Sequence, residues 1–348
     1  MNTRETFDVA IVGAGPSGAT LACLLAKLGW SVALLERDTF PRDKLCGEFL
    51  SHEAHDVFDA IGVYEAIEQD APRIERAAIF STTGAVVRAT LPRAAWGVSR
   101  LKLDETLFER ARALGATCVE GAKVRRMHQT ADGVQVRTRV GDEDVELRSR
   151  VAVGAYGRRA RLDQELAREL TPERRSWVGM KQHHIPRDAD AVHETLANTV
   201  ELHAFKGGYC GFSHVEGGLV NACALFTKDT LERAPAPTWE GLAKHISREN
   251  EALARRLDGL QASPTKTQAV AEVPFERKTL VDGRIFWVGD AGAMITPMTG
   301  DGQAMAVQSA ALLAPVLSDV VRRLRSARGG GGRERARGRG GGGGGGGG

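Results

Sequence analysis

Three glycines and one glutamate near the N-terminus have the types and spacing of a nucleotide-binding site. In the run GAGPSG, Gly13, Gly15 and Gly18 form a G-x-G-x-x-G turn, and Glu36 follows 23 positions after Gly13. The first glycine permits a tight turn, the second lets the backbone approach a pyrophosphate, and the third lets a helix lie near the preceding strand. A carboxylate about 20 positions later binds ribose hydroxyls. The spacing predicts a dinucleotide site, although this stretch alone fits both NAD and FAD.

A strand, a helix and a second strand must position these residues. The apolar run Val9–Val12 is typical of a buried parallel strand. From Ala19 to Leu28 the leucines recur at helical spacing, and Gly29 supplies a C-terminal cap. The second strand, Val32–Leu35, ends at Glu36. This strand–helix–strand order favours a nucleotide site over a plain glycine-rich turn.

A second glycine-rich stretch, GRIFWVGDAGAMITPMTGDGQAMA, lies far along the chain from Gly283 to Ala306. Its apolar run ends at Asp290, whose carboxylate can accept hydrogen bonds from polyol hydroxyls. Gly300 and Gly302 leave backbone N–H groups open where a helix begins, which suits an anion or a polarised ring oxygen. One ligand that touches both motifs must be long, which points to FAD.

Together these motifs resemble those of the FAD-dependent oxidoreductases of the geranylgeranyl reductase-like and aromatic-hydroxylase-like superfamily, from about Asp8 to Leu317. The resemblance places Arg100 near the flavin chain and Val124 at the adenine, although an ordinary ion pair and a core position are the alternatives for these two. The residues predicted to contact the cofactor are Gly13, Gly15, Pro16, Ser17, Gly18, Glu36, Arg37, Arg100, Val124, Gly289, Asp290, Pro297, Gly300 and Gly302.

The chain departs from this family at VAVGAYGRRARLD. Tyr156 stands where the family has the aspartate of an Ala-Asp-Gly turn. In the hydroxylase branch that turn is linked to the cofactor pyrophosphate and to NAD(P)H. The departure weakens the expectation that NADPH or NADH is the electron donor.

The run FPRDKLCGEFL resembles the reductase-like branch, in which Pro-Arg-x-Lys-x-Cys-Gly precedes a flavin-facing turn. Cys46 is therefore a candidate catalytic residue, with a small buried hydrophobe as the alternative. Tyr209 and Phe212 in YCGFSHVEGG are candidates to line a substrate pocket, with a plain core strand as the alternative. The Trp-x-Trp-x-Ile-Pro run of flavin halogenases does not occur.

The fold class implied is α/β, a Rossmann-type FAD-binding domain with an interleaved antiparallel-sheet substrate domain. We assign residues 1–70, 100–165 and 276–320 to the cofactor domain, and 71–99 and 166–275 to the substrate domain. Residues 321–348, rich in Arg and Gly, are predicted to be a disordered tail.

Composition limits the remaining functions. The tail holds eight arginines and one glutamate, so the net charge of +3 becomes −4 for the rest of the chain, which gives no case for a folded nucleic-acid surface. The five cysteines have no metal spacing and indicate reduced thiols. We find no signal peptide and no apolar run long enough to span a bilayer, and we expect a cytoplasmic protein without a metal and of unknown oligomeric state.

The sequence predicts an FAD-dependent oxidoreductase acting on an apolar or aromatic small molecule. Reduction of a C=C bond is favoured by the PRDKLCG run. The alternatives are an NAD(P)H-dependent flavin monooxygenase and, in another class, a non-redox carrier of a prenyl-type ligand. The two glycine-rich motifs argue against the carrier, which has no need of FAD.

Overall fold

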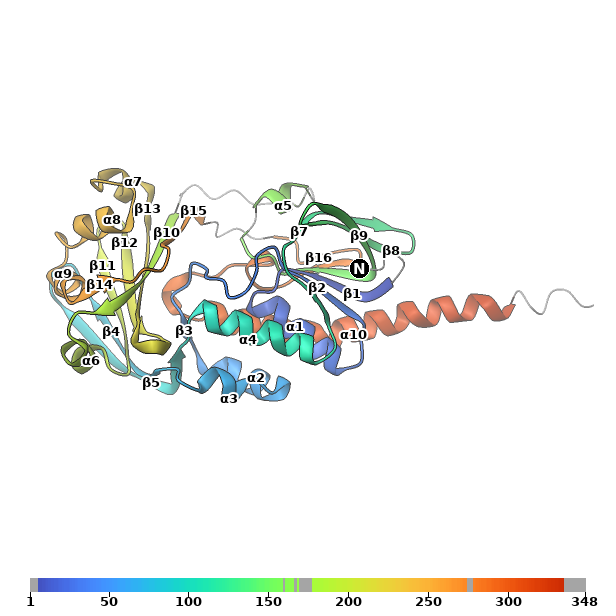
Figure 1. Ribbon diagram of the computed structural model, residues 1–348, viewed down its shortest axis with the longest axis horizontal. Helices are drawn as coiled ribbons and strands as arrows, with labels where there is room; N and C mark the ends of the chain where they lie inside the picture. The colour runs from blue at the N-terminus through green and yellow to red at the C-terminus, as the bar shows by residue number, and fades with distance from the viewer. Residues whose placement is uncertain (1–5, 159, 166–167, 169–176, 274–277, 335–348) are drawn as a thin grey trace, which may run out of the picture.

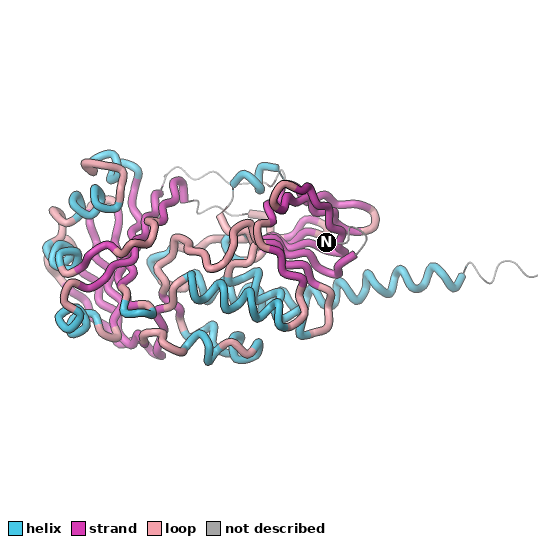
Figure 2. The backbone as a smooth tube through the Cα atoms, in the orientation of Figure 1, coloured by secondary structure: helices cyan, strands magenta, loops and turns pink. Residues whose placement is uncertain are grey.

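Two sheets, each covered by its own helices, make up the protein (Figure 1). The computed structural model describes residues 6–158, 160–165, 168, 177–273 and 278–334. The tube in Figure 2 shows the strands in two separate groups, with loops and helices between them.

Sheet A contains the nucleotide-binding turn. In spatial order it runs β16-β17-β9-β1-β2-β6, and β7 and β8 continue from β9 as an antiparallel meander. The pairs β17·β9, β9·β1, β1·β2 and β2·β6 are parallel. Its strands are β1 (Thr6–Val12), β2 (Val32–Leu35), β6 (Thr117–Val119), β7 (Ala122–Thr130), β8 (Gly133–Val140), β9 (Glu143–Gly154), β16 (Val281–Asp282) and β17 (Ile285–Trp287).

Sheet B is antiparallel apart from the parallel pair β4·β11, and it runs β14-β10-β13-β12-β11-β4-β5-β3, with β15 also beside β10. Its strands are β3 (Phe49–Leu50), β4 (Arg73–Phe80), β5 (Val86–Gly97), β10 (Trp177–Pro186), β11 (Thr199–Phe205), β12 (Gly208–His214), β13 (Val220–Thr227), β14 (Leu260–Ala262) and β15 (Gln268–Val273). Every strand except β3 lies in the chain segments that the sequence assigns to its domain.

The helices cover these sheets. They are α1 (Pro16–Lys27), α2 (His55–Ile61), α3 (Tyr64–Glu68), α4 (Arg100–Ala113), α5 (Ala160–Glu165), α6 (Ala189–Leu196), α7 (Lys228–Arg233), α8 (Trp239–Ile246), α9 (Glu251–Asp258) and α10 (Gly302–Glu334), with short 3₁₀ turns η1 (His52–Ala54), η2 (Glu216–Gly218), η3 (Gly289–Ala291) and η4 (Pro297–Thr299). Leucines of α1 and α4 share one core with sheet A and α10. Helices α6, α8 and α9 share another core with sheet B.

Capping residues explain where several helices begin. The side chain of Ser99 accepts a hydrogen bond from Lys102 N at the start of α4. Asn250 accepts one from Leu253 N at the start of α9. Such caps satisfy backbone donors that have no partner inside the helix. The cap at Asn250 also separates α9 from α8, which ends at Ile246.

The prediction of disorder from residue 321 onward is wrong for 321–334, because α10 continues to Glu334. Val321 is fully buried against the core, and Arg325 forms ion pairs with the buried Asp8. Val307 and Leu317 lie on the same apolar stripe of α10 and are buried in the core that the helix shares with sheet A. Residues 335–348 lie outside the described part of the chain.

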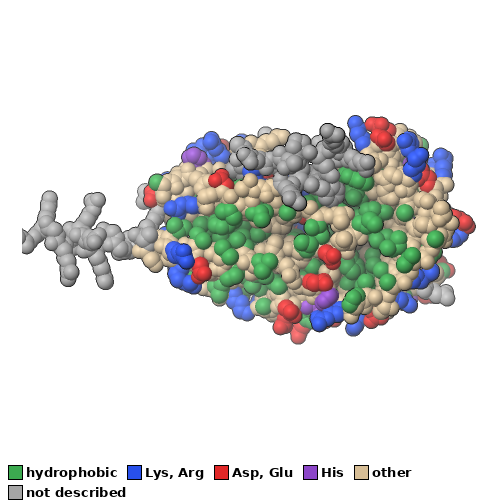
Figure 3. All heavy atoms as spheres, turned by 180° about the vertical axis from the view of Figure 1, so that it is seen from behind, with side chains coloured by type: hydrophobic (Ala, Val, Ile, Leu, Met, Phe, Trp, Pro, Cys, Tyr) green, Lys and Arg blue, Asp and Glu red, His purple; other side chains and the backbone are tan. Residues whose placement is uncertain are grey.

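Helix α10 also corrects the expectation about apolar runs. By length and composition alone, Gly302–Ser326 is long and apolar enough to cross a membrane. One side of the helix packs into the core, and Met305, Leu312 and Val316 are exposed. Figure 3 shows from behind that hydrophobic side chains gather on that face of the molecule. A core helix of a globular protein meets the same criteria, so this feature assigns no location.

Candidate functional site

A cavity of about 360 Å³ lies at the carboxyl ends of the sheet A strands, where nucleotides bind in open parallel sheets. Fourteen of the residues singled out above line it. Its lining includes all of the predicted cofactor residues except Gly18 and Gly289, and it also includes Cys46 and Tyr156. Motifs far apart in the sequence therefore meet at one site.

The first turn has the geometry that its glycines predict. Gly13 has φ +103°, and a Cβ on it would lie 2.4 Å from Ala155 O. A Cβ on Gly18 would lie 1.9 Å from Gly13 O, so this residue keeps α1 close to β1 instead of lining the cavity. Gly15 caps α1 without a side-chain hydrogen bond, which leaves the N–H groups of the first turn open to an anion.

A buried ionic network stands beside this turn. Glu36 is 5% exposed, and its Oε2 accepts hydrogen bonds from Ala14 N at 2.8 Å and from Arg42 Nη2 at 3.2 Å. Arg42 also donates to Asp104, which Arg100 holds through two further contacts of 2.8 and 2.6 Å. Burial on its own would lower the pKa of Arg100, but Asp104 outweighs it and raises that pKa. The network fixes Glu36 and Arg100 at the cavity wall.

The second glycine-rich stretch joins the first through Gly289. This residue has φ +58°, and a Cβ on it would lie 2.6 Å from Ser17 Oγ at the start of α1. Asp290 follows, half-exposed, with Arg158 Nε 3.7 Å from its carboxylate. Gly300 has φ +78° and leads to Gly302, the first residue of α10. The start of α10 therefore points its open N–H groups at the cavity.

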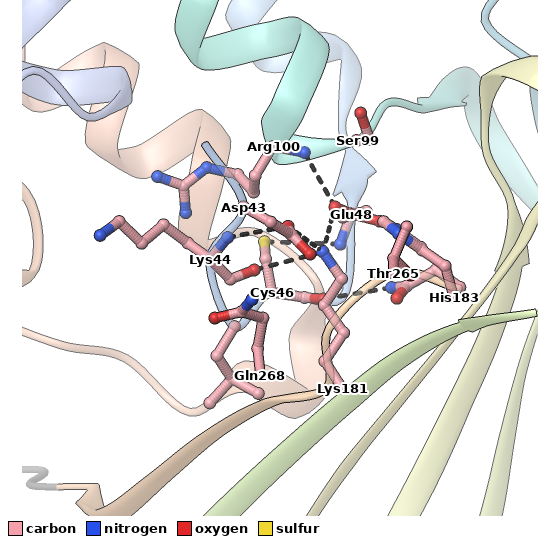
Figure 4. Close-up of polar contacts among 12 residues, drawn as sticks. Asp43, Lys44, Cys46, Glu48, Ser99, Arg100, Lys181, His183, Thr265 and Gln268 are labelled. Carbon is pink, nitrogen blue, oxygen red and sulfur yellow. Dashed lines mark hydrogen bonds and ion pairs between the residues drawn. The ribbon is translucent and has the colours of Figure 1, made fainter. Parts of the chain in front are cut away.

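Cys46 lies between the two sheets, with Asn221 of sheet B and Gln303 of α10 as contacts (Figure 4). Its Sγ accepts hydrogen bonds from Gln303 Nε2 at 3.1 Å and from Glu48 N at 3.4 Å. Both contacts use the sulfur as acceptor, so the thiol proton stays available to a group in the cavity.

These features fit FAD. Glycines give the cavity backbone walls at two places where an added side chain would take up room or clash. Open helix N-termini suit a pyrophosphate and a ring oxygen, and the half-exposed Asp290 suits a polyol. The family model described as an FAD binding domain matches residues 6–328.

The chain belongs to the FAD binding domain family. It is an FAD-dependent enzyme of the oxidoreductase and monooxygenase type.

Relatives of this flavoprotein differ in their reactions. The menaquinone reductase of Mycobacterium tuberculosis is 26% identical over 330 residues, which cover 91% of this chain and 78% of that protein. A flavin-dependent monooxygenase of Mycobacteroides abscessus is 24% identical over 90% of this chain and 68% of its own length. The chain spans about a third, 34%, of another relative, conditioned medium factor receptor 1 of Dictyostelium discoideum, at 32% identity over 44% of this chain. The relatives are named for different reactions, so the similarity alone does not say which reaction this chain catalyses.

Solved structures agree on the fold. The flavin-dependent brominase Bmp2 superposes with a TM-score of 0.78 at 20% identity, covering 91% of this chain and 80% of that one. At this identity the similarity concerns the fold alone, an α/β flavoprotein fold as the sequence predicts.

The departure at Tyr156 has a structural counterpart. The Tyr156 hydroxyl donates to Asp163 Oδ1 at 2.6 Å and accepts from Trp287 Nε1 at 2.8 Å. Asp163 is fully buried and pairs with Arg168 and Lys278. Burial raises the pKa of Tyr156, so the hydroxyl stays protonated. The carboxylate that the turn lacks at Tyr156 is therefore supplied seven positions later by Asp163, which the tyrosine hydroxyl contacts.

The prediction that Tyr209 and Phe212 line one pocket is wrong for Phe212. Residues three positions apart on a strand point to opposite faces of a sheet. Phe212 is 1% exposed and lies in the core beneath α6, α8 and α9. Tyr209 belongs to the other face of β12, the face that is shared with Lys181 and His183 of β10. Neither residue lines the cavity described above.

Sequence reasoning missed several residues at the site. Arg42, Arg158 and Gln303 line the cavity, and Lys181 and Asn221 of sheet B contact the segment that carries Cys46. The sequence held one indication for Lys181. It stands in the middle of the strand-like run WVGMKQHHIP, where a buried lysine would need a partner of opposite charge. Among the described residues, no group of three or more His, Cys, Asp or Glu side chains is arranged to hold a metal ion.

Proposed function

We propose that this flavoprotein reduces a C=C bond in an apolar, prenyl- or quinone-type small molecule. The observation that carries the proposal is the thiol of Cys46, which lies at the cavity beside the start of α10 with its proton free. The similarity to menaquinone reductase over 91% of the chain supports the same class of reaction.

FAD would lie along the cavity, with the ribose of its AMP half at Glu36, the adenine at Val124, the ribityl chain at Asp290 and the ring beside Gly300 and Gly302. Once bound and reduced, the flavin would supply the hydride that one carbon of the double bond receives. Cys46 Sγ gives the proton to the other carbon and then recovers a proton from solvent, so the saturated product gains two hydrogens. Gln303 and the backbone N–H of Glu48 stabilise the thiolate that this transfer leaves.

Apolar side chains support an apolar substrate. Leu45, Phe49, Val270, Met294 and Ile295 line the same cavity as Cys46. They exclude water from the reacting atoms. We propose that reduced nicotinamide, NADPH or NADH, supplies the electrons. Tyr209 remains our proposed substrate contact, on the face of sheet B that it shares with Lys181.

The test uses the FAD-loaded protein under anaerobic conditions, with its flavin reduced by dithionite. Menaquinone and geranylgeranyl diphosphate are the probes, and product mass is measured. We expect a gain of two hydrogens that is lost or strongly slowed in Cys46→Ala while FAD stays bound. Cys118→Ala is the matched control, since this half-buried thiol lies on β6 and does not line the cavity. A second anaerobic experiment replaces dithionite with NADPH or NADH and follows bleaching of the flavin colour.

A monooxygenase is the second candidate, because the relative from Mycobacteroides abscessus carries that name over 90% of the chain. Labelled oxygen in the product after O₂ is admitted would establish it and reject the reductase. Tight binding of a prenyl probe by protein that takes up no FAD would support the carrier instead.

A further inference from the structure

The loop from Asp43 to Phe49 carries Cys46 and is held between the two sheets (Figure 4). One contact is apolar: Leu45 lies over Gly179 of β10, where a Cβ would be 2.4 Å from Leu45 Cδ2. The absence of a side chain at Gly179 thus makes room for the loop on the strand.

Three consecutive carbonyl groups of this loop accept hydrogen bonds from side chains. Lys181 Nζ binds Lys44 O at 3.3 Å, Arg158 Nη2 binds Leu45 O at 3.4 Å, and Asn221 Nδ2 binds Cys46 O at 3.1 Å. Lys181 and Asn221 belong to β10 and β13 of sheet B, and Arg158 follows β9 of sheet A. Both domains therefore fix the backbone on either side of Cys46.

Lys181 also forms the charged centre of this contact. It is 1% exposed, and its Nζ lies 2.5 Å from Asp43 Oδ1 and 2.5 Å from Glu48 Oε1. The two carboxylates stand at the two ends of the loop, so one cation holds both ends.

Glu48 is tied down from further sides. His183 Nε2 lies 2.6 Å from its Oε2, and Arg100 N donates to its Oε1 at 2.8 Å. Burial on its own would raise the pKa of Glu48, but Lys181 and His183 outweigh it and lower that pKa. The carboxylate stays ionised, and without Lys181 it would face the charge of Asp43 at close range.

We propose that Lys181 is the positioning residue for Cys46: the ammonium group of the substrate-side sheet holds both ends of the Asp43–Phe49 loop and so keeps the Cys46 thiol against Gln303 at the cavity. The role assigned to the thiol rests on the proposed function, whereas the positioning does not. Loss of Lys181 leaves the buried Glu48 and the partly buried Asp43 without their shared cation, and the loop opens.

The test measures the rate at which iodoacetamide alkylates Cys46 in the FAD-loaded protein, by mass spectrometry of its peptides. In Lys181→Met we expect this rate to rise by at least about tenfold, because local opening controls access to a held thiol. Cys118 is read in the same sample and should keep its rate. Lys228→Met, on the surface of α7 where the side chain is 68% exposed, is the matched control and should change neither rate.

A charge rescue separates positioning from general packing. In the double variant Lys181→Met, Glu48→Gln the Glu48 charge that Lys181 balanced is removed, but the contacts that hold the two loop ends are not restored, so we expect the melting temperature to return toward wild type while the Cys46 rate stays raised. If Lys181→Met fails to fold, this double variant and Asn221→Ala, which removes one carbonyl contact, are measured instead. Asn221→Ala should raise the Cys46 rate by a smaller factor, about threefold, since it breaks one neutral hydrogen bond.

An unchanged Cys46 rate in Lys181→Met, or an equal rise at Cys118, would overturn the proposal. The first result means that the loop is held without Lys181, and the second means that the whole protein has loosened. Alkylation needs no turnover, so the outcome is independent of the reaction catalysed. If Cys46→Ala still forms the reduced product while the alkylation results hold, the proton donor is wrong and the positioning role stands.

Discussion

Replacing Glu36 tests the nucleotide site most directly. The buried carboxylate accepts from Ala14 N at 2.8 Å, from Asp38 N at 3.1 Å and from Arg42, and it lines the cavity where the ribose would lie. In Glu36→Ala the charge of Arg42 keeps Asp104 as a partner, so no unpaired cation is created.

The expected loss in FAD affinity is that of one hydrogen bond to a charged group. Such a bond contributes about 1.5–3 kcal/mol, which raises Kd by roughly tenfold to a hundredfold. The Ala14 N–H also loses its acceptor, which costs the FAD-free protein about 1–3 kcal/mol of stability. Glu36→Gln keeps an acceptor for this N–H, so its stability should be nearer wild type while its FAD affinity still falls.

The assay titrates FAD into FAD-free protein and follows flavin fluorescence, with thermal melting recorded separately. Glu75→Ala, a partly exposed carboxylate on β4, controls for the loss of one negative charge. A wild-type Kd in Glu36→Ala would refute the reasoning, because the ribose could not then lie at Glu36. A lower melting temperature with an unchanged Kd for FAD would mean that Glu36 stabilises the glycine-rich turn and does not bind the cofactor.

Three further predictions follow from single contacts. In Gly302→Ala the added Cβ meets nothing within 4 Å, so the melting temperature without FAD should be unchanged while the Kd for FAD rises by at least about tenfold. In Gly18→Ala the added Cβ would lie 1.9 Å from Gly13 O, so the melting temperature should fall as well. Equal melting temperatures of the two variants would contradict this prediction. His184 accepts a hydrogen bond from Trp239 Nε1 and donates one to Gln182 O, and burial lowers its pKa from 6.5 to about 4. Because the unfolded chain keeps the higher pKa, the free energy of unfolding should be greatest above pH 6.5 and should fall by on the order of 3 kcal/mol as the pH drops toward 4. Denaturant unfolding should show this pH dependence in wild type and not in His184→Gln. The buried atoms His183 Nδ1, Asn221 Oδ1 and Ser213 Oγ, on neighbouring strands of one sheet face, have no hydrogen-bond partner among the described residues, so a crystal structure should show ordered water bridging them, and a dry site there would contradict the prediction.

Local patterns carried the prediction of the cofactor site. Gly13, Gly18 and Glu36 have a fixed spacing because the turn, the helix and the second strand have fixed geometry, and the structure places these residues as that geometry requires. The PRDKLCG run likewise singled out Cys46, which lines the cavity.

Contacts between distant segments could not be predicted in this way. Lys181 and Asn221 of sheet B contact the loop that carries Cys46, and Arg42 pairs with Asp104, 62 positions away. Nothing in the sequence around these residues specifies those partners. The prediction for Phe212 was wrong for a different reason. Side chains alternate between the two faces of a strand, so Tyr209 and Phe212, three positions apart, cannot line the same pocket. The helix over 321–334 was missed because its glycines and arginines outweighed apolar positions such as Val321, which is buried against the core.

The place of β17 in sheet A has a consequence for how this protein is made. Residues 285–287 pair in parallel with 152–154, and Gly289 then closes against Ser17. A chain growing on the ribosome has its nucleotide-binding turn early, yet the opposite wall appears only after all of sheet B has been synthesised. Until then residues 152–154, at the carboxyl end of β9 beyond its pairing with β8, present an unpaired strand edge that can bind other chains. Protection of that edge during synthesis, by a chaperone or by slow release, should therefore govern the yield of active flavoprotein.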